Sequence, residues 1–441
     1  MIETSTPNQR AFVLLPVLQR SQFDVDARLE EASGLAEALD LDVVRAESTP
    51  MRTVESGSFF GSGKVAAFAS ELSAEDISVC VVDAALSPVQ QRNLEKALSV
   101  KVIDRTGLIL EIFGRRARTR EGRLQVELAR LAYERSRLVR TWTHLERQRG
   151  GGGFLAGPGE TQIETDRRLL ADKMAKLRKE LEQVRRTRGL HRKNRRDAPY
   201  PMVALVGYTN AGKSTLFNRV TGAGVFAKDM PFATLDTTVR GFETPAGVKA
   251  LMSDTVGFIT DLPTELVAAF RATLEEVREA DVLLHILDAS APDFALRRRE
   301  VEDILNSLEA GAEHGQVVIE VFNKFDLIPD DADPDFPAPD RDNFARVIIS
   351  AQTGEGVERL MKTIDAALAM TAQMLIVQAG ADDAKAVAWL HQNGAVLDER
   401  TDESSGEVTL AVRLSPEDSG RFPSLFPEVS VQVRNPGRAI S

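Results

Sequence analysis

The stretch MVALVGYTNAGKST at residues 202–215 contains the residue types that bind phosphate. An apolar segment runs into the spacing G-x-x-x-x-G-K-S, in which Gly207 and Gly212 let the backbone wrap around an anion. The N–H groups of such a loop, and of the helix after it, supply partial positive charge. Lys213 can then reach the β- and γ-phosphates of a nucleotide, and the Ser214 hydroxyl can bind magnesium. We interpret the stretch as a phosphate-binding loop, with a plain glycine turn as the weak alternative.

A carboxylate that could serve the same site ends the stretch ALMSDTVG, residues 250–257. Asp254 follows an apolar run of strand type, and a carboxylate there can hold magnesium directly or through one water. Gly257 lies three residues further on, where its backbone N–H can approach a γ-phosphate. The pattern is common alone, but its order after a phosphate-binding loop makes it specific.

The segment PFATLDTTVRG between these motifs, residues 231–241, carries three threonines. A switch loop needs one threonine that binds magnesium and senses the γ-phosphate. Thr234, Thr237 and Thr238 all qualify chemically, and their spacing alone does not choose among them. The alternative for each is an ordinary turn hydroxyl, which must hold for at least two of the three.

The stretch VVIEVFNKFD, residues 317–326, indicates which base is bound. The Asp326 carboxylate can accept hydrogen bonds from guanine N1–H and N2–H₂, whereas adenine lacks that donor pattern. Asn323 can brace the loop, and the Lys324 stem can cover the base. At the end of a later apolar stretch, the Ala351 N–H can meet guanine O6. These residues together favour GTP over ATP.

Phe258 stands directly after Gly257, where Ras-like GTPases place the glutamine that orients the attacking water. A phenylalanine cannot form that hydrogen bond, so backbone, another residue or a partner must position the water. Simple packing of Phe258 under the switch is compatible with this interpretation. We therefore expect slow intrinsic hydrolysis that a partner stimulates.

Short apolar runs of strand type, the first at residues 11–17, are separated by helix-like stretches near 25–38 and 89–98. This alternation predicts an α/β domain over residues 1–110. The sequence FFGSGK at 59–64 lacks the spacer and the hydroxyl of a phosphate-binding loop. We interpret it as a strand-to-helix turn.

Residues 111–198 show a different, seven-residue period. Leucines from Leu124 to Leu145 recur every seven positions, and apolar residues from Leu170 to Val184 alternate spacings of four and three. Two such helices joined by the glycine-rich stretch 150–159 predict an antiparallel hairpin arm, with a first helix of about 42 Å. Residues 111–200 hold 24 Lys and Arg against 12 Asp and Glu, whereas the remainder carries a net charge of −23. The arm is therefore a candidate surface for a polyanion, with a solvated hairpin as the alternative.

The motifs above belong to a predicted Ras-like GTPase domain over residues 199–370. Residues 371–441 follow the order strand, helix, strand, strand, helix, strand, which predicts a small ferredoxin-like α+β domain. His285 lies inside the apolar stretch VLLHILD, and we expect it to be a packed core residue.

The chain has 441 residues, which predicts about three domains or more, and 43% hydrophobic residues, which predicts well-formed cores. The single cysteine, Cys80, excludes an internal disulfide. The N-terminus has no signal pattern, and no apolar run approaches a membrane span. We expect a cytoplasmic monomer, with peripheral membrane association as an alternative.

The full set of motifs closely resembles the HflX family of translation-factor-class GTPases, over nearly the whole chain. The stretches that carry the resemblance are VIDRTGLILEIF (102–113), RARTREGRLQVELA (116–129), GPGETQIETDRR (157–168), GYTNAGKS (207–214) and DTVGFI (254–259). FATLD at 232–236 is similar to the family's switch segment, which implies that Thr234 is the magnesium threonine. The resemblance is weakest for the C-terminal unit, because no motif comparable to those of the family follows residue 370.

The motifs and the resemblance together predict a site with Mg²⁺ as cofactor. Lys213, Thr234 and Gly257 are the predicted catalytic residues, and Ser214 and Thr234 the metal ligands, with Asp254 acting through water. The predicted nucleotide contacts are Gly207, Tyr208, Thr209, Asn210, Ala211, Gly212, Lys213, Ser214, Thr215, Phe232, Ala233, Thr234, Leu235, Asp236, Asp254, Thr255, Val256, Gly257, Asn323, Lys324, Phe325, Asp326, Ser350, Ala351 and Gln352.

The resemblance also implies guanine-nucleotide-dependent binding to the large ribosomal subunit and its RNA, and splitting or rescue of stalled ribosomes under stress. We expect the tip at residues 150–159 to enter an RNA-lined site, which the resemblance places at the peptidyl-transferase region, with Phe154 stacking on a base. A flexible hinge is the alternative for the tip. A GTPase of RNA modification or ribosome assembly, and a scaffold that binds GTP without turnover, are the alternatives for the whole chain.

Overall fold

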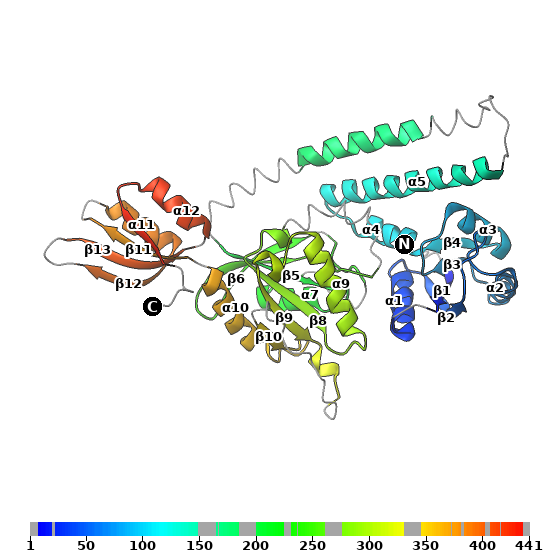
Figure 1. Cartoon of the computed structure of the whole chain (residues 1–441). Coiled ribbons are helices and arrows are strands. Elements are labelled where there is room, and N and C mark those ends of the chain that lie inside the picture. The colour runs from blue at the N-terminus through cyan, green and yellow to red at the C-terminus, as the bar shows by residue number, and fades with distance from the viewer. Residues whose placement is uncertain are drawn as a thin grey trace, which may run out of the picture.

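The computed structural model describes residues 8–19, 23–148, 165, 167–184, 200–224, 231–235, 237–260, 276–329, 345–371, 373–380, 383–401, 406–414 and 416–434. The predicted tip at 150–159 with Phe154, and the predicted contact Asp236, lie outside these residues. Three separate sheets organise the chain, and Figure 1 shows the six-stranded sheet between the two four-stranded ones. Within the described residues, no helix is long and apolar enough to span a membrane.

The N-terminal unit is a parallel four-stranded sheet with order β2-β1-β3-β4. Its strands are β1 (Arg10–Leu18), β2 (Asp42–Met51), β3 (Val79–Val82) and β4 (Lys101–Asp104). Its helices are α1 (Val25–Glu37), α2 (Ser62–Ala74), α3 (Pro88–Leu98) and α4 (Arg105–Arg116). Ser87 and Gln90 form a capping box at α3, and Asp104 caps α4 by accepting from the Gly107 N–H at 2.8 Å. The predicted α/β fold is confirmed here.

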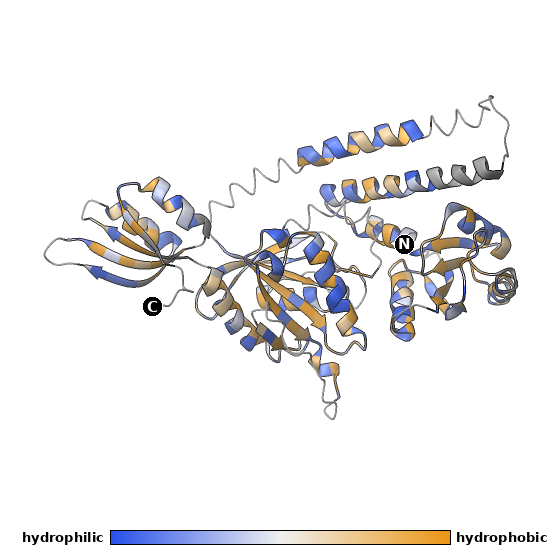
Figure 2. Cartoon of the chain, in the orientation of Figure 1, coloured by the Kyte–Doolittle hydropathy of each residue, from blue (hydrophilic) through white to orange (hydrophobic). Residues whose placement is uncertain are grey.

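The arm consists of α5 (Arg120–Gln148) and a helix over residues 167–184, which run side by side in Figure 1. Leucines at the predicted seam and Met174 bury one another between the two helices, and Lys173 pairs with Glu127 at 3.0 Å. Figure 2 shows that the second helix is mainly hydrophilic apart from this apolar stripe. The two helices and the apolar seam between them agree with the hairpin that the seven-residue period predicts.

The GTPase domain is built on a six-stranded sheet with order β10-β9-β8-β5-β7-β6, parallel except for the edge strand β6. Its strands are β5 (Met202–Gly207), β6 (Thr238–Glu243), β7 (Lys249–Asp254), β8 (Val282–Asp288), β9 (Val317–Asn323) and β10 (Ala345–Ile348). Its helices include α7 (Lys213–Thr221), α9 (Phe294–Ser307) and α10 (Val357–Thr371), with short 3₁₀ turns η1 (Ala312–His314) and η2 (Phe325–Leu327). The inner strands are mainly apolar in Figure 2, as expected for a parallel sheet covered on both faces.

The C-terminal unit is an antiparallel sheet with order β12-β13-β11-β14. Its elements are β11 (Gln373–Ala379), α11 (Ala384–Asn393), β12 (Ala395–Thr401), β13 (Val408–Leu414), α12 (Pro416–Leu425) and β14 (Ser430–Arg434). This order and connectivity are those of the predicted ferredoxin-like fold. The residue boundaries between the four units stay a prediction.

One apolar core continues from the N-terminal unit into the GTPase domain. Leu35 of α1 and Phe113 of α4 are buried in the same cluster as Val206 of β5 and Phe258. The two units therefore share packing, which places the N-terminal helices directly behind the phosphate-binding loop.

Candidate nucleotide-binding site

A cleft of about 320 Å³ opens at the carboxyl ends of the parallel strands, where ligands of open α/β sheets bind. The predicted contacts that line it are Thr209, Asn210, Gly212, Lys213, Ser214, Thr215, Phe232, Ala233, Thr234, Thr255, Gly257, Asn323, Lys324, Asp326, Ala351 and Gln352. The described residues that were predicted as contacts but do not line it are Gly207, Tyr208, Ala211, Leu235, Asp254, Val256, Phe325 and Ser350. Motifs from five separate stretches of sequence thus meet around one cleft.

The phosphate-binding loop requires glycine at both of its motif positions. Gly207 has φ +151°, and a Cβ there would lie 2.3 Å from the Ile286 carbonyl oxygen. Gly212 has φ +90°, and a Cβ there would lie 2.1 Å from Asn323 Nδ2. Any side chain at either position would collide with β8 or with the base-recognition loop, so the spacing has a steric cause.

Lys213 is the buried cation of this loop, with 6% of its surface exposed. Its Nζ donates to the carbonyl oxygens of Gly207, at 3.1 Å, and Tyr208, at 2.7 Å. Burial lowers the pKa of Lys213 to about 8, while the Asp254 carboxylate opposes that shift. The ammonium group is thus held by the loop beside the cleft, where a bound phosphate would stabilise its charge.

Three oxygen-bearing side chains meet at the edge of the cleft. Ser214 Oγ and Thr234 Oγ1 lie 2.8 Å apart, and they donate to the same oxygen, Asp254 Oδ2, at 2.8 and 2.9 Å. The other carboxylate oxygen, Asp254 Oδ1, is buried without a hydrogen-bond partner among the described residues. Burial raises the pKa of Asp254, and the hydroxyls and Lys213 oppose that shift. Thr238, by contrast, begins β6.

Asn323 joins the phosphate-binding loop to the base-recognition loops. Its Nδ2 donates to the Ala211 carbonyl oxygen, and its Oδ1 accepts from the Ala351 N–H, both at 2.8 Å. The sequence predicts that the Ala351 N–H donates to guanine O6. In this structure the same N–H donates to Asn323, so a bound guanine would share this donor with Asn323. Lys324 adopts a left-handed backbone with φ 63° and pairs with Asp288 Oδ2 at 2.8 Å, beside Asp326 at the cleft.

Two supporting residues, Arg219 and Leu327, are not indicated by the sequence pattern. Arg219 of α7 donates to the carbonyl oxygens of Ala351, at 2.7 Å, and Gln352, at 2.6 Å, and so braces the loop after β10. Leu327, which is 61% exposed, lines the cleft beside Asp326. No local signal could identify Arg219, because its partners lie more than 130 residues away in the chain.

Phe258 packs away from the cleft. It is 2% exposed and belongs to the core shared with the N-terminal unit. Its backbone pairs with the phosphate-binding loop, because its N–H donates to Gly207 at 3.1 Å and its carbonyl accepts from Thr209 at 2.7 Å. The packing interpretation of Phe258 agrees with this position, and its side chain orients no water.

The mostly parallel sheet, the phosphate-binding loop and the base-recognition loops define a P-loop GTPase. Family models match along the chain with the descriptions "GTP-binding GTPase N-terminal" at 26–114, "GTP-binding GTPase Middle Region" at 116–195, "50S ribosome-binding GTPase" at 202–324 and "HflX C-terminal domain" at 338–424. The chain is 46% identical over 435 residues to a GTPase HflX of Magnetococcus marinus, covering 98% of this chain and 99% of the relative. It is 42% identical over 386 residues to a GTPase HflX of Escherichia coli, covering 88% and 89%.

The chain therefore belongs to the HflX GTPase family, and it binds and hydrolyses GTP. The resemblance seen in the sequence is confirmed, and the match of an HflX C-terminal model extends it beyond residue 370. Among solved structures, a GTP-binding protein from the archaeon Sulfolobus solfataricus in complex with GDP is similar at 24% identity and TM-score 0.43. That likeness covers 81% of this chain and 98% of the other.

Proposed function

We propose that this GTPase is a magnesium-dependent switch that binds the large ribosomal subunit and splits or rescues stalled ribosomes under stress. The observation that carries the proposal is the meeting of Thr234, Ser214 and Asp254 at one edge of the cleft. A hydroxyl from the switch segment reaches a carboxylate and a loop hydroxyl there, which is the donor set that senses a γ-phosphate through a metal.

The residues present fit Mg²⁺. Magnesium takes oxygen ligands and keeps several waters, and it is held through one or two carboxylates and the substrate phosphates. Ser214 and Thr234 would supply hydroxyl oxygens, and the unpartnered Asp254 Oδ1 would gain a partner, directly or through water. When bound, the ion would neutralise charge that develops on the phosphates.

The chain's own groups would do the rest of the chemistry. Lys213 would hold the β- and γ-phosphates. Gly257 lies beside it, since a Cβ at Gly257 would lie 3.0 Å from Lys213 Nζ, and the Gly257 N–H would act on the γ-phosphate. Asp326 accepts from guanine and so selects GTP over ATP. Because the side chain of Phe258 is buried in the core, the attacking water needs another orienting group. We therefore expect slow intrinsic turnover that ribosomes accelerate.

The basic arm is the proposed ribosome-binding element. Residues 111–200 carry a net charge of +12 in a chain whose net charge is −11. Lysine and arginine along a hairpin can meet RNA phosphates without reading sequence. The family model that matches residues 202–324 is described as a 50S ribosome-binding GTPase, which supports the same partner. The glycine-rich tip would approach RNA closely, with Phe154 stacking on a base.

Replacement of the tip tests this function. A variant with a short polar turn in place of residues 150–159 should fold and hydrolyse GTP at the intrinsic rate but no longer split 70S ribosomes in a sucrose gradient. A second variant keeps the loop length and changes only Phe154→Ser, and splitting should weaken because the proposed stacking ring is lost. Splitting at the wild-type rate by the shortened variant would contradict the proposal, and equal binding to isolated RNA would favour an assembly or modification factor.

A further inference from the structure

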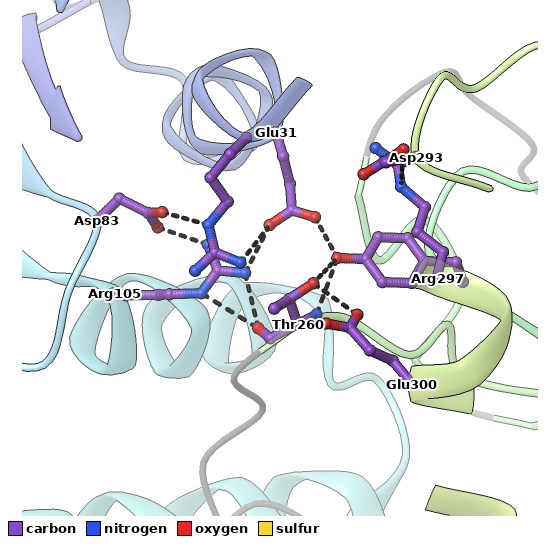
Figure 3. A network of polar contacts seen from close by, with 9 residues as sticks. Glu31, Asp83, Arg105, Thr260, Asp293, Arg297 and Glu300 are labelled. Carbon is purple, nitrogen blue, oxygen red and sulfur yellow. Dashed lines mark hydrogen bonds and ion pairs between the residues drawn. The ribbon is translucent and has the colours of Figure 1, made fainter. Parts of the chain in front are cut away.

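The backbone of Thr260, three residues after Gly257, is held from two sides by side chains of different domains. Its N–H donates to Tyr208 Oη, from the phosphate-binding loop, at 2.8 Å. Its carbonyl oxygen accepts from the guanidinium of Arg105, from the N-terminal unit, at 2.7 and 3.3 Å. Figure 3 shows Arg105 meeting Thr260 at this junction, with Glu31 bonded to Arg105. Tyr208, predicted as a nucleotide contact, thus sends its side chain away from the cleft.

Glu31 of α1 closes this arrangement into a ring. One of its carboxylate oxygens accepts from Arg105 at 2.6 Å, and the other accepts from the Tyr208 hydroxyl. Asp83 holds the opposite side of Arg105, and its other oxygen accepts from Arg28 at 2.6 Å. All four charged side chains are at least 92% buried, so each is held by partners rather than by water. Burial and the Glu31 carboxylate raise the pKa of Tyr208, so the phenol stays a donor.

Apolar contacts attach both switch segments to the same unit. The ring of Phe232, two residues before Thr234, meets the ring of Phe113 edge-on, with centroids 4.5 Å apart. Phe258 and Ile259 are buried in the core that the N-terminal unit shares with the GTPase domain. The segment that carries Thr234 and the segment that carries Gly257 therefore both rest on the N-terminal unit.

We propose that Tyr208, Arg105 and Glu31, named here the Thr260 clamp, are positioning residues for GTP hydrolysis. In this structure the clamp is formed together with the hydrogen bonds among Thr234, Ser214 and Asp254. By holding both backbone groups of Thr260, the clamp fixes the path of the chain from Gly257 onward. A preorganised N–H at Gly257 acts on charge that develops during phosphate transfer. This inference rests on the proposed assignment of Gly257 and Thr234 to the γ-phosphate.

The clamp also defines which measurements should change. The clamp acts through the side chains of Tyr208, Arg105 and Glu31, and in the described part of the chain their hydrogen bonds go to none of the side chains assigned to the guanine or to the phosphates. GDP affinity should therefore be unaffected. Only the state that contains a γ-phosphate depends on the position of Gly257, so kcat should fall while KM changes little.

Tyr208→Phe in the full chain tests the proposal, because it removes only the hydroxyl. The ring remains to pack under Arg297, whose guanidinium lies 4.8 Å from the ring centroid, so the variant should fold. We expect kcat to fall at least about tenfold, because the hydroxyl's hydrogen bonds to the Glu31 carboxylate and from the Thr260 N–H are both lost, with KM and GDP affinity within about twofold of the wild type. Tyr133→Phe is the matched control, since Tyr133 also donates to a buried carboxylate, Asp104, at 2.7 Å, and within the described residues its hydroxyl bonds to none of the clamp residues or Thr260.

Glu31→Gln supplies the second arm. Paired with Tyr208→Phe in a double-mutant cycle, it should show that the two losses of kcat are not additive, because both act through one contact. A Tyr208→Phe variant with unchanged or raised kcat, or two fully additive losses, would overturn the proposal. Thr234→Ala, measured alongside, distinguishes failure of the clamp proposal from failure of the proposed function. If Thr234→Ala lowers kcat and Tyr208→Phe does not, only the clamp proposal is wrong. If neither variant lowers kcat, the assignment of Thr234 to the switch is wrong.

Discussion

Thr234 Oγ1 donates a hydrogen bond to Asp254 Oδ2 at 2.9 Å. This bond joins the segment before β6 to the carboxyl end of β7. Neither residue belongs to the phosphate-binding loop, but both also meet its Ser214. In the proposed function, closure of the switch segment changes the contacts among these three side chains, which are the proposed magnesium ligands. This contact separates Thr234 from the other two threonines of its segment.

Thr234→Ala should spare GDP binding and remove the response to GTP. A ligand that senses the γ-phosphate matters only when that phosphate is present, so GDP affinity by calorimetry should stay within about twofold of the wild type. Hydrolysis should fall by about 100-fold, the scale of one lost transition-state contact. Thr237→Ala and Thr238→Ala are the matched controls. If either control reproduced this phenotype and Thr234→Ala did not, the switch residue would be misassigned.

Asp326→Asn should weaken GTP binding by at least about 100-fold, because two hydrogen bonds from guanine to a carboxylate are lost. The amide places a donor where xanthine presents an acceptor, so xanthosine triphosphate should bind better than it does to the wild type. Competition between the two nucleotides measures the change. An undiminished preference for GTP would refute the guanine assignment.

His285→Leu should reduce the acid sensitivity of folding. Burial, with the Arg298 and Lys213 cations, lowers the pKa of His285 to about 3. Between about pH 6.5 and 3 the unfolded chain binds a proton at this position and the folded chain does not, so stability falls as pH falls. For each unit by which the pH is lowered in that window, the wild type should lose up to about 1.4 kcal/mol more of its free energy of unfolding than the variant loses. Urea unfolding from pH 7 to 4.5 measures it; parallel declines in both proteins would show that His285 is not responsible.

The parts of the site that follow from the sequence are those encoded by contiguous residues. Gly207, Gly212 and Lys213 lie within one loop whose spacing has a steric and electrostatic cause, and the arm follows from a seven-residue period that is itself local. The fold class was predictable for the same reason, since alternating strands and helices restrict the topology. Thr234 needed the family resemblance, because spacing alone left three candidates.

The parts that could not be predicted depend on contacts between distant segments. Tyr208 belongs to the loop motif, but its hydroxyl meets Glu31, which lies 177 residues away in the chain. Arg105 reaches Thr260 across 155 residues. A sequence pattern indicates which residues can bind phosphate, but it does not show that the N-terminal unit packs behind the loop. Only the tertiary structure brings these charges together.

Sedimentation with purified large ribosomal subunits tests the central claim most directly. The full chain should pellet with subunits in the presence of a non-hydrolysable GTP analogue and stay in the supernatant with GDP, because the γ-phosphate closes the switch. Thr234→Ala should stay in the supernatant with both nucleotides. Equal pelleting with GDP and with the analogue, or pelleting with neither, would contradict a nucleotide-controlled ribosome switch.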